Sequence, residues 1–270
     1  MGRIKLFVII VVLVLLCSCS DGTDFLPIDT SGEESDLKAY TYDELKNSER
    51  IVFNESLLLI NQTHPISDND VFDVCEYKDT DVYMNSCMHS DYARLSSDIS
   101  EKFSEKLFVM SAYRTKEEQQ QAIAEEGEKA AGINESEHRA GLALDVYVRY
   151  YAGEAFLKTD TGKYVNSECH KYGFIIRYPE YGEKITGIGY EPWHIRYVGH
   201  PHAEIMMLNK LTLEEYISYL ELGKFYRYGD YLITKQDPKN TFLPHSFESA
   251  VISSDNDGNI IITMVSPLPG

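Results

Sequence analysis

Two short motifs constrain this chain more than any other feature of its sequence. The first, SEHRAGLALD, begins at Ser136, and the second, EPWH, ends at His194. Zinc enzymes commonly bind the metal through three nitrogen or oxygen side chains and keep a fourth position open for water. His138, Asp145 and His194 would form such a set, and Glu191 would then be the base beside the activated water. The two motifs therefore predict a catalytic zinc centre.

The residues around both motifs alternate in the way that half-buried strands do. In residues 142–148, the apolar side chains share one face of an expected strand and Asp145 lies on the other. In residues 193–198, His194 likewise lies opposite the apolar side chains. If the two strands are neighbours, Asp145 and His194 come within reach of one metal ion.

Several further segments, in matching order, make the sequence similar to a known family. They are SAYRT at Ser111–Thr115, KYGF at Lys171–Phe174 and RYP at Arg177–Pro179, and the similarity runs from about Leu57 to Leu222. Together with the S-x-H-x-x-G-x-A-x-D and E-x-W-H motifs, they resemble the VanY-like D-alanyl-D-alanine carboxypeptidases, of the LAS group of zinc peptidases. The resemblance implies an α+β fold with a small, mainly antiparallel sheet flanked by helices.

The resemblance also assigns the roles of the motif residues. It implies one zinc ion held by His138, Asp145 and His194, with Glu191 as the catalytic base. Arg139 departs from the pattern, because a glutamine is expected after the metal-binding histidine. This difference leaves the preference of the neighbouring subsite open.

Three more residues are expected to act on the substrate. Arg114 would either bind a carboxylate of the substrate or stabilise the developing oxyanion, and a fixed guanidinium serves both roles. Ser136 and Gln119 match positions that line the family's substrate pocket, although Gln119 could instead lie on a solvated helix face. His200 and His202 fall in a loop that leads into a helix, and we do not expect them to bind the metal.

The function implied is a zinc-dependent D,D-carboxypeptidase that releases the terminal D-alanine from peptidoglycan stem peptides. Two other enzymes remain open: an L,D-carboxypeptidase acting on tetrapeptide stems, and a D,D-dipeptidase acting on free D-Ala-D-Ala. A catalytically inactive, zinc-containing lipoprotein that binds cell-wall peptide is an alternative of a different class. The retained Glu191 favours an enzyme.

The first residues resemble an export signal. A short basic start precedes an unbroken apolar run, Leu6–Leu16, which is too short for a comfortable membrane span of ~20 residues. The run ends in LCSC, which resembles a bacterial lipobox with Cys19 as the lipidated residue. We therefore expect a lipoprotein signal peptide over residues 1–18 and an enzyme anchored to the outer face of the cell membrane.

A flexible acidic tether is expected over residues 19–38, because this segment is polar and lacks apolar periodicity. The zinc carboxypeptidase domain would occupy residues 39–223, and short strand-like segments predict a small β appendage over residues 224–270. Cys75 and Cys87 could form a disulfide in an exported protein.

The overall charge limits the possible partners. The chain has 270 residues, with 43 Asp and Glu against 25 Lys and Arg, and a net charge of −18. A nucleic-acid partner is not expected, because this surface cannot neutralise phosphates. We expect a monomer.

Helices and strands are predicted from apolar spacing and capping patterns. Capping boxes indicate short helices that begin near Thr41 and Leu211. The other expected elements are a strand over 56–60, a helix over 91–106, a strand over 107–110 that ends near Arg114, and a helix over 115–131.

Overall fold

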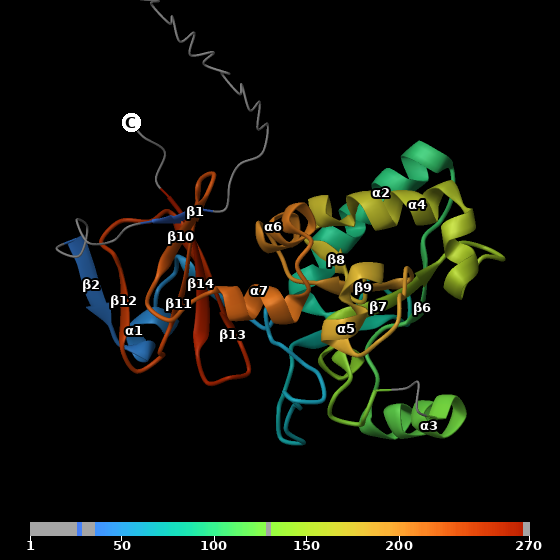
Figure 1. Cartoon of the computed structure of the whole chain (residues 1–270), viewed down its shortest axis with the longest axis horizontal. Helices are drawn as coiled ribbons and strands as arrows, with labels where there is room; N and C mark the ends of the chain where they lie inside the picture. The colour runs from blue at the N-terminus through green and yellow to red at the C-terminus, as the bar shows by residue number, and fades with distance from the viewer. Residues whose placement is uncertain (1–25, 29–35, 128–130, 267–270) are drawn as a thin grey trace, which may run out of the picture.

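The computed structural model describes residues 26–28, 36–127 and 131–266, which form two lobes (Figure 1). The α/β lobe is built on a four-stranded antiparallel sheet, and the β lobe on a six-stranded sheet with a separate strand pair. This is the α+β architecture predicted from the sequence. The strands of the α/β lobe are β6 (Phe108–Ser111), β7 (Ala143–Tyr147), β8 (Phe174–Ile176) and β9 (His194–Tyr197), in the spatial order β6-β7-β9-β8.

One face of this sheet is covered by helices that pack on it (Figure 1). Apolar side chains of α2 (His89–Phe103) and α4 (Asp160–Glu168) pack with those of β7 and β9 in one core cluster. The remaining helices and the small hairpin of this lobe are α3 (Lys116–Glu126), α5 (Glu183–Thr186), α6 (His202–Asn209), α7 (Leu213–Tyr219), β4 (Val74–Glu76) and β5 (Tyr83–Asn85). Short 3-10 helices are η2 (Ser86–Met88), η4 (Glu137–Ala140), η5 (Gly153–Lys158), η6 (Cys169–Tyr172) and η7 (Glu180–Gly182).

The alternation predicted for β7 and β9 is confirmed. Leu144 and Val146 are buried in the core beneath the helices, whereas Asp145 faces the opposite side of the sheet. Asp145 and His194 are direct partners in the antiparallel register of the two strands. The pairing therefore places both side chains on the face of the sheet opposite α2 and α4.

Two helices begin where capping boxes predicted them, and the helix predicted from residue 115 is capped in the same way. Thr41, Thr115 and Thr212 each accept the amide of the third helical residue, whose glutamate accepts the threonine amide in return. They open α1 (Tyr42–Lys46), α3 and α7 respectively. The helix α3 ends at Glu126, before the predicted end at residue 131.

The β lobe combines strands from both ends of the chain. Its six-stranded sheet has the order β1-β10-β11-β14-β13-β3. These strands are β1 (Leu26–Ile28), β3 (Ile51–Asn54), β10 (Phe225–Tyr228), β11 (Tyr231–Gln236), β13 (Ser249–Ser254) and β14 (Ile260–Val265). The strand β12 (Thr241–Pro244) pairs with β2 (Leu37–Tyr40).

This arrangement corrects two of the predicted boundaries. Strands β1 and β2 contain residues 26–28 and 37–38 of the segment expected to be a flexible tether, because β10 and β12 supply hydrogen-bonding partners for them. The appendage is also larger than residues 224–270, since β3 pairs in parallel with β13. Such pairings join segments nearly two hundred residues apart. Local sequence patterns cannot predict them.

The strand predicted over residues 56–60 is absent from the described structure, and the strand of this region is β3. Residues 57–60 are buried nonetheless. The carbonyls of Ser56 and Leu58 accept hydrogen bonds from Arg196, and the Leu57 amide donates to Ser253. Side chains therefore satisfy this backbone in place of a neighbouring strand.

A buried histidine joins the two lobes. His202, at the start of α6, lies with Nδ1 2.6 Å from the Tyr216 hydroxyl and Nε2 2.8 Å from Thr263 on β14. Burial lowers the pKa of His202 to about 3, so that the ring is neutral. As expected from the sequence, His202 is not near the candidate metal ligands, and its role is structural.

The predicted disulfide is wrong in this structure, because Cys75 and Cys87 are free thiols. Cys75 is exposed and pairs across the hairpin with Met84, whereas Cys87 lies in η2 and packs against the core. The two side chains therefore belong to different environments. Cys169 is buried.

The predicted signal peptide and the lipidated Cys19 lie outside the described residues. In the described part of the chain, no helix is both long enough and apolar enough to span a bilayer.

Candidate metal centre

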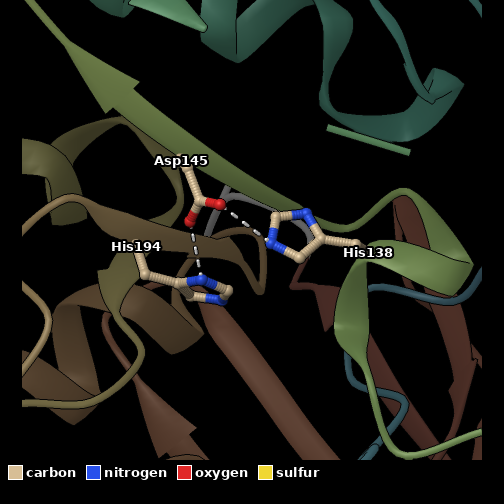
Figure 2. A group of neighbouring side chains, drawn as sticks. All are labelled: His138, Asp145 and His194. Carbon is tan, nitrogen blue, oxygen red and sulfur yellow. Dashed lines mark hydrogen bonds and ion pairs between the residues drawn. The ribbon is translucent and has the colours of Figure 1, made fainter. Parts of the chain in front are cut away.

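Three side chains from three elements meet on the face of the sheet opposite α2 and α4 (Figure 2). His138 comes from η4, Asp145 from β7 and His194 from β9. One ligand atom from each lies within 4.8 Å of the others. These are the three residues that the sequence motifs single out, and their donor atoms are of the kinds that zinc binds.

The orientation of His138 is fixed by the backbone. Its Nδ1 lies 2.7 Å from the carbonyl oxygen of Ala112, which can only accept a hydrogen bond, so Nδ1 carries the proton. Nε2 is then left with a free lone pair, and it lies 3.3 Å from Asp145 Oδ2. His138 therefore presents an unprotonated nitrogen toward the centre of the site.

A glycine lets the η4 turn pack closely enough to place His138. Gly141 ends η4 with φ of +67°, a conformation that favours glycine. A Cβ atom there would lie 2.9 Å from the backbone nitrogen of Asn85. Both the backbone conformation and the close packing therefore require glycine at this position of the HxxG motif.

His194 is held on the other side of the same carboxylate. Its Nδ1 lies 2.9 Å from Asp145 Oδ1, and its Nε2 faces Glu137 Oε2 at 3.7 Å. The ring packs against Tyr178 with a centroid distance of 5.0 Å. Asp145 therefore faces one nitrogen from each histidine, and a cation between the three groups would match their charges.

The electrostatics of the site are those of a dense charge cluster. Burial alone would raise the pKa of Asp145, but the two imidazoles outweigh it and hold that pKa well below its usual range. Burial alone would lower the pKa of His194, but the carboxylates of Asp145 and Glu137 raise it to about 9. The site thus concentrates negative charge around nitrogen donors, as a divalent cation requires.

Glu191 lies beside the three donors without being one of them. Its amide donates to the Tyr178 carbonyl, and its own carbonyl accepts from the His194 amide, which closes the EPWH turn. This turn sets Glu191 Oε2 3.8 Å from His194 Nδ1. The carboxylate is therefore close enough to act on a water molecule at the centre of the site.

Arg114 reaches the opposite side of Asp145 from the end of β6. Its Nε donates to Ser111 at 2.8 Å, its Nη1 to Gln119 at 3.3 Å and its Nη2 to Asp145 Oδ2 at 3.4 Å. The guanidinium is therefore fixed in direction and supplies a positive charge at the edge of the site.

Ser136 and Gln119 line the same cavity, which has a volume of about 920 Å³. Gln119 is buried, so the alternative of a solvated helix face is wrong. Its Nε2 donates to the Ala131 carbonyl while its Oε1 accepts from Arg114. Gln119 thus positions Arg114 as well as lining the cavity.

Two neighbours of the site were not predicted from the sequence. Glu137 is fully buried behind His194, and Tyr178 covers the ring of the same histidine. Glu137 directly precedes His138 in the first motif, and Tyr178 belongs to the RYP segment, so both stood within recognised motifs. Their contacts with His194 depend on tertiary structure and had no local signal.

Comparison with known proteins identifies the family of this chain. The family model of VanY, D-alanyl-D-alanine carboxypeptidase, matches residues 81–200. A D-alanyl-D-alanine carboxypeptidase of Enterococcus faecium is 34% identical, over 80% of this chain and 77% of its own length.

Two solved structures show the same fold. The D,D-dipeptidase VanXYg, in complex with a D-Ala-D-Ala phosphinate analogue, has a TM-score of 0.68 at 26% identity and covers 85% of this chain and 98% of its own. A variant of the D,D-pentapeptidase VanY from a VanB-type resistance cassette, in complex with Zn(II), has a TM-score of 0.54 at 28% identity. It covers 60% of this chain and 98% of its own.

These likenesses place the fold among the LAS-type zinc peptidases, in agreement with the predicted fold class. Within that class, the chain belongs to the VanY family of D-alanyl-D-alanine carboxypeptidases, because the relative from Enterococcus faecium matches most of both chains.

Proposed function

We propose that this protein is a zinc-dependent D,D-carboxypeptidase that removes the terminal D-alanine from peptidoglycan stem peptides. The observation that carries the proposal is the position of Glu191, 3.8 Å from His194 and outside the set of three donors. A protein that only held a metal would not need a carboxylate at this place. Membership of the carboxypeptidase family supports the choice of substrate.

The residues present fit a single zinc ion held by His138, Asp145 and His194. Two imidazoles and one carboxylate form a donor set typical of catalytic zinc sites. When bound, zinc acts as a Lewis acid and lowers the pKa of a water molecule toward ~7.

The surrounding side chains would do the remaining chemistry. Glu191 accepts the proton of the attacking water and returns it to the amine of the departing D-alanine. Arg114, already fixed by Ser111 and Gln119, supplies a guanidinium either to the developing oxyanion or to the terminal carboxylate of the substrate. Both roles require the orientation that these hydrogen bonds maintain.

Incubation of the purified protein with defined stem peptides tests this proposal. We expect one D-alanine to be released from a pentapeptide stem, with a tetrapeptide as the other product, as measured by mass spectrometry. Cleavage of tetrapeptide stems alone would indicate an L,D-carboxypeptidase, and cleavage of free D-Ala-D-Ala alone would indicate a dipeptidase. Binding of peptide and zinc without any cleavage would indicate the inactive binding lipoprotein.

We also propose that the enzyme is anchored to the outer face of the cell membrane through a lipid on Cys19. The basic start, the apolar run and the LCSC sequence support this location. Replacement of Cys19 with alanine is expected to move the protein from the membrane fraction to the soluble fraction of the producing cells. Cys17→Ala is the matched control and should stay with the membrane. Equal membrane association of both variants would contradict the anchor.

A further inference from the structure

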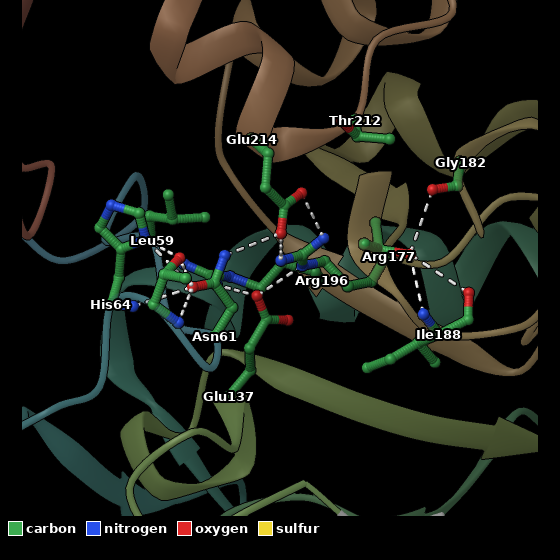
Figure 3. Close-up of polar contacts among 12 residues, drawn as sticks. Leu59, Asn61, His64, Glu137, Arg177, Gly182, Ile188, Arg196, Thr212 and Glu214 are labelled. Carbon is green, nitrogen blue, oxygen red and sulfur yellow. Dashed lines mark hydrogen bonds and ion pairs between the residues drawn. The ribbon is translucent and has the colours of Figure 1, made fainter. Parts of the chain in front are cut away.

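The two carboxylate oxygens of Glu137 face different groups, and Figure 3 shows the oxygen that contacts the arginines. Oε1 accepts hydrogen bonds from Arg177 Nε and Arg196 Nη1, both at 2.6 Å. Oε2 faces His194 Nε2 at 3.7 Å, and neither of these two atoms has a hydrogen-bond partner among the described residues. One oxygen is therefore committed to the arginines, and the other points at the candidate metal ligand.

The two arginines are themselves held firmly, so the carboxylate has little freedom to turn. Arg177 makes two hydrogen bonds to Glu214 on α7, at 2.9 and 2.6 Å. Arg196 donates to the carbonyls of Ser56 and Leu58. Both guanidinium groups are almost completely buried, and buried charges persist only when they are paired with good geometry.

Two carboxylates compete for the proton of His194, because Nδ1 lies 2.9 Å from Asp145 Oδ1 and Nε2 lies 3.7 Å from Glu137 Oε2. A cation held between Asp145 and Nδ1 would displace the proton from Nδ1. An ionised carboxylate only accepts hydrogen bonds, so Glu137 favours a proton on Nε2. The lone pair of Nδ1 would then be available to the cation on the side of Asp145. The arrangement resembles that of a metal-binding histidine whose second nitrogen donates to a carboxylate, which fixes the tautomer and the orientation of the ring.

We propose that Glu137 is a positioning residue for the metal site, which holds His194 with Nδ1 toward the metal by accepting a hydrogen bond from Nε2. The inference rests on the proposed zinc function. It requires that the ring close the 3.7 Å separation in the metal-loaded protein. Arg177 and Arg196 act through Glu137, because they fix the direction in which its free oxygen points.

Glu137→Gln tests this role, with Glu214→Gln as the matched control. The glutamine at position 137 can still accept from both arginines through its carbonyl oxygen, but it presents an NH₂ group to His194 and favours a proton on Nδ1. Glu214→Gln removes the same charge from the same cluster of arginines without contacting His194. Both substitutions should lower stability, whereas only Glu137→Gln should weaken zinc binding.

The readout is zinc affinity, measured by competition with a chromophoric chelator. We expect a loss of about 10–100-fold for Glu137→Gln, the range found for carboxylate partners of metal-binding histidines, and little change for Glu214→Gln. Equal zinc affinities of the two variants would overturn the proposal. A wild-type protein that binds zinc but cleaves no stem peptide would overturn the proposed function alone.

A second measurement covers the case in which Glu137→Gln does not fold. In the zinc-loaded wild-type protein labelled with ¹⁵N-histidine, NMR should show one ligand imidazole protonated at Nδ1 and the other at Nε2. The first is His138, whose Nδ1 donates to Ala112, and the second is His194. Two ligand rings that are both protonated at Nδ1 would refute the role given to Glu137.

Discussion

Glu191→Gln is expected to lower kcat for D-alanine release by about 10²–10⁴-fold, the usual contribution of a general base. Glutamine preserves the shape of the side chain but cannot accept the proton of the attacking water. Glu191 is not one of the three clustered donors, so zinc content and stability should be retained. The measurement is the turnover of a pentapeptide stem, with zinc determined on the same samples.

Glu183→Gln is a suitable control for this experiment. Glu183 is exposed at the start of α5 and does not line the cavity of the site. Its substitution removes one negative charge from a nearby segment without changing the chemistry, and activity should be unchanged. If Glu191→Gln were as active as the wild-type protein, another residue would have to be the base, and the proposed role of Glu191 would be wrong.

The parts of the site that the sequence predicted are those with a local pattern. Alternation along β7 and β9 predicted that Asp145 and His194 face away from the core, and the register of the strands places them as direct partners. The capping boxes near Thr41 and Leu211 marked the beginnings of α1 and α7. Each of these features depends on residues only a few positions apart.

The features that the sequence did not predict depend on contacts between distant segments. The buried contact of Glu137 joins it to Arg177 and Arg196, which lie 40 and 59 residues further along the chain. The β lobe draws β1, β2 and β3 from the N-terminal part of the chain, although the first two lie largely in a segment that reads as a polar tether. Composition alone does not indicate which distant strand will supply the hydrogen bonds.

The orientations of the side chains in the site depend on the surrounding fold. His138 is oriented by a backbone carbonyl and Arg114 by two polar side chains, while His194 is covered by the ring of Tyr178. None of these partners is a candidate metal ligand. Preorganised neighbours of this kind keep catalytic groups in position, so that little reorganisation is needed during the reaction.

The second large effect is expected when a metal ligand is removed. His194→Ala deletes one of three donors and leaves the carboxylates of Asp145 and Glu137 without the imidazole between them. Zinc content after dialysis should fall from about one ion per chain toward zero, because catalytic zinc sites depend on all three protein ligands. Activity on the pentapeptide stem should be lost with the metal.

His200→Ala is the matched control for this loss, because it removes an imidazole that is close in sequence but remote from the donor set. His200 lies 3.8 Å from Asp91 and is not part of the cluster formed by His138, Asp145 and His194. We therefore expect His200→Ala to retain zinc. Full zinc content in His194→Ala, or a loss in His200→Ala as large as in His194→Ala, would show that the metal is held by a different set of residues. Since the proposed mechanism relies on Glu191 standing beside His194, such a result would require the base to be assigned anew as well.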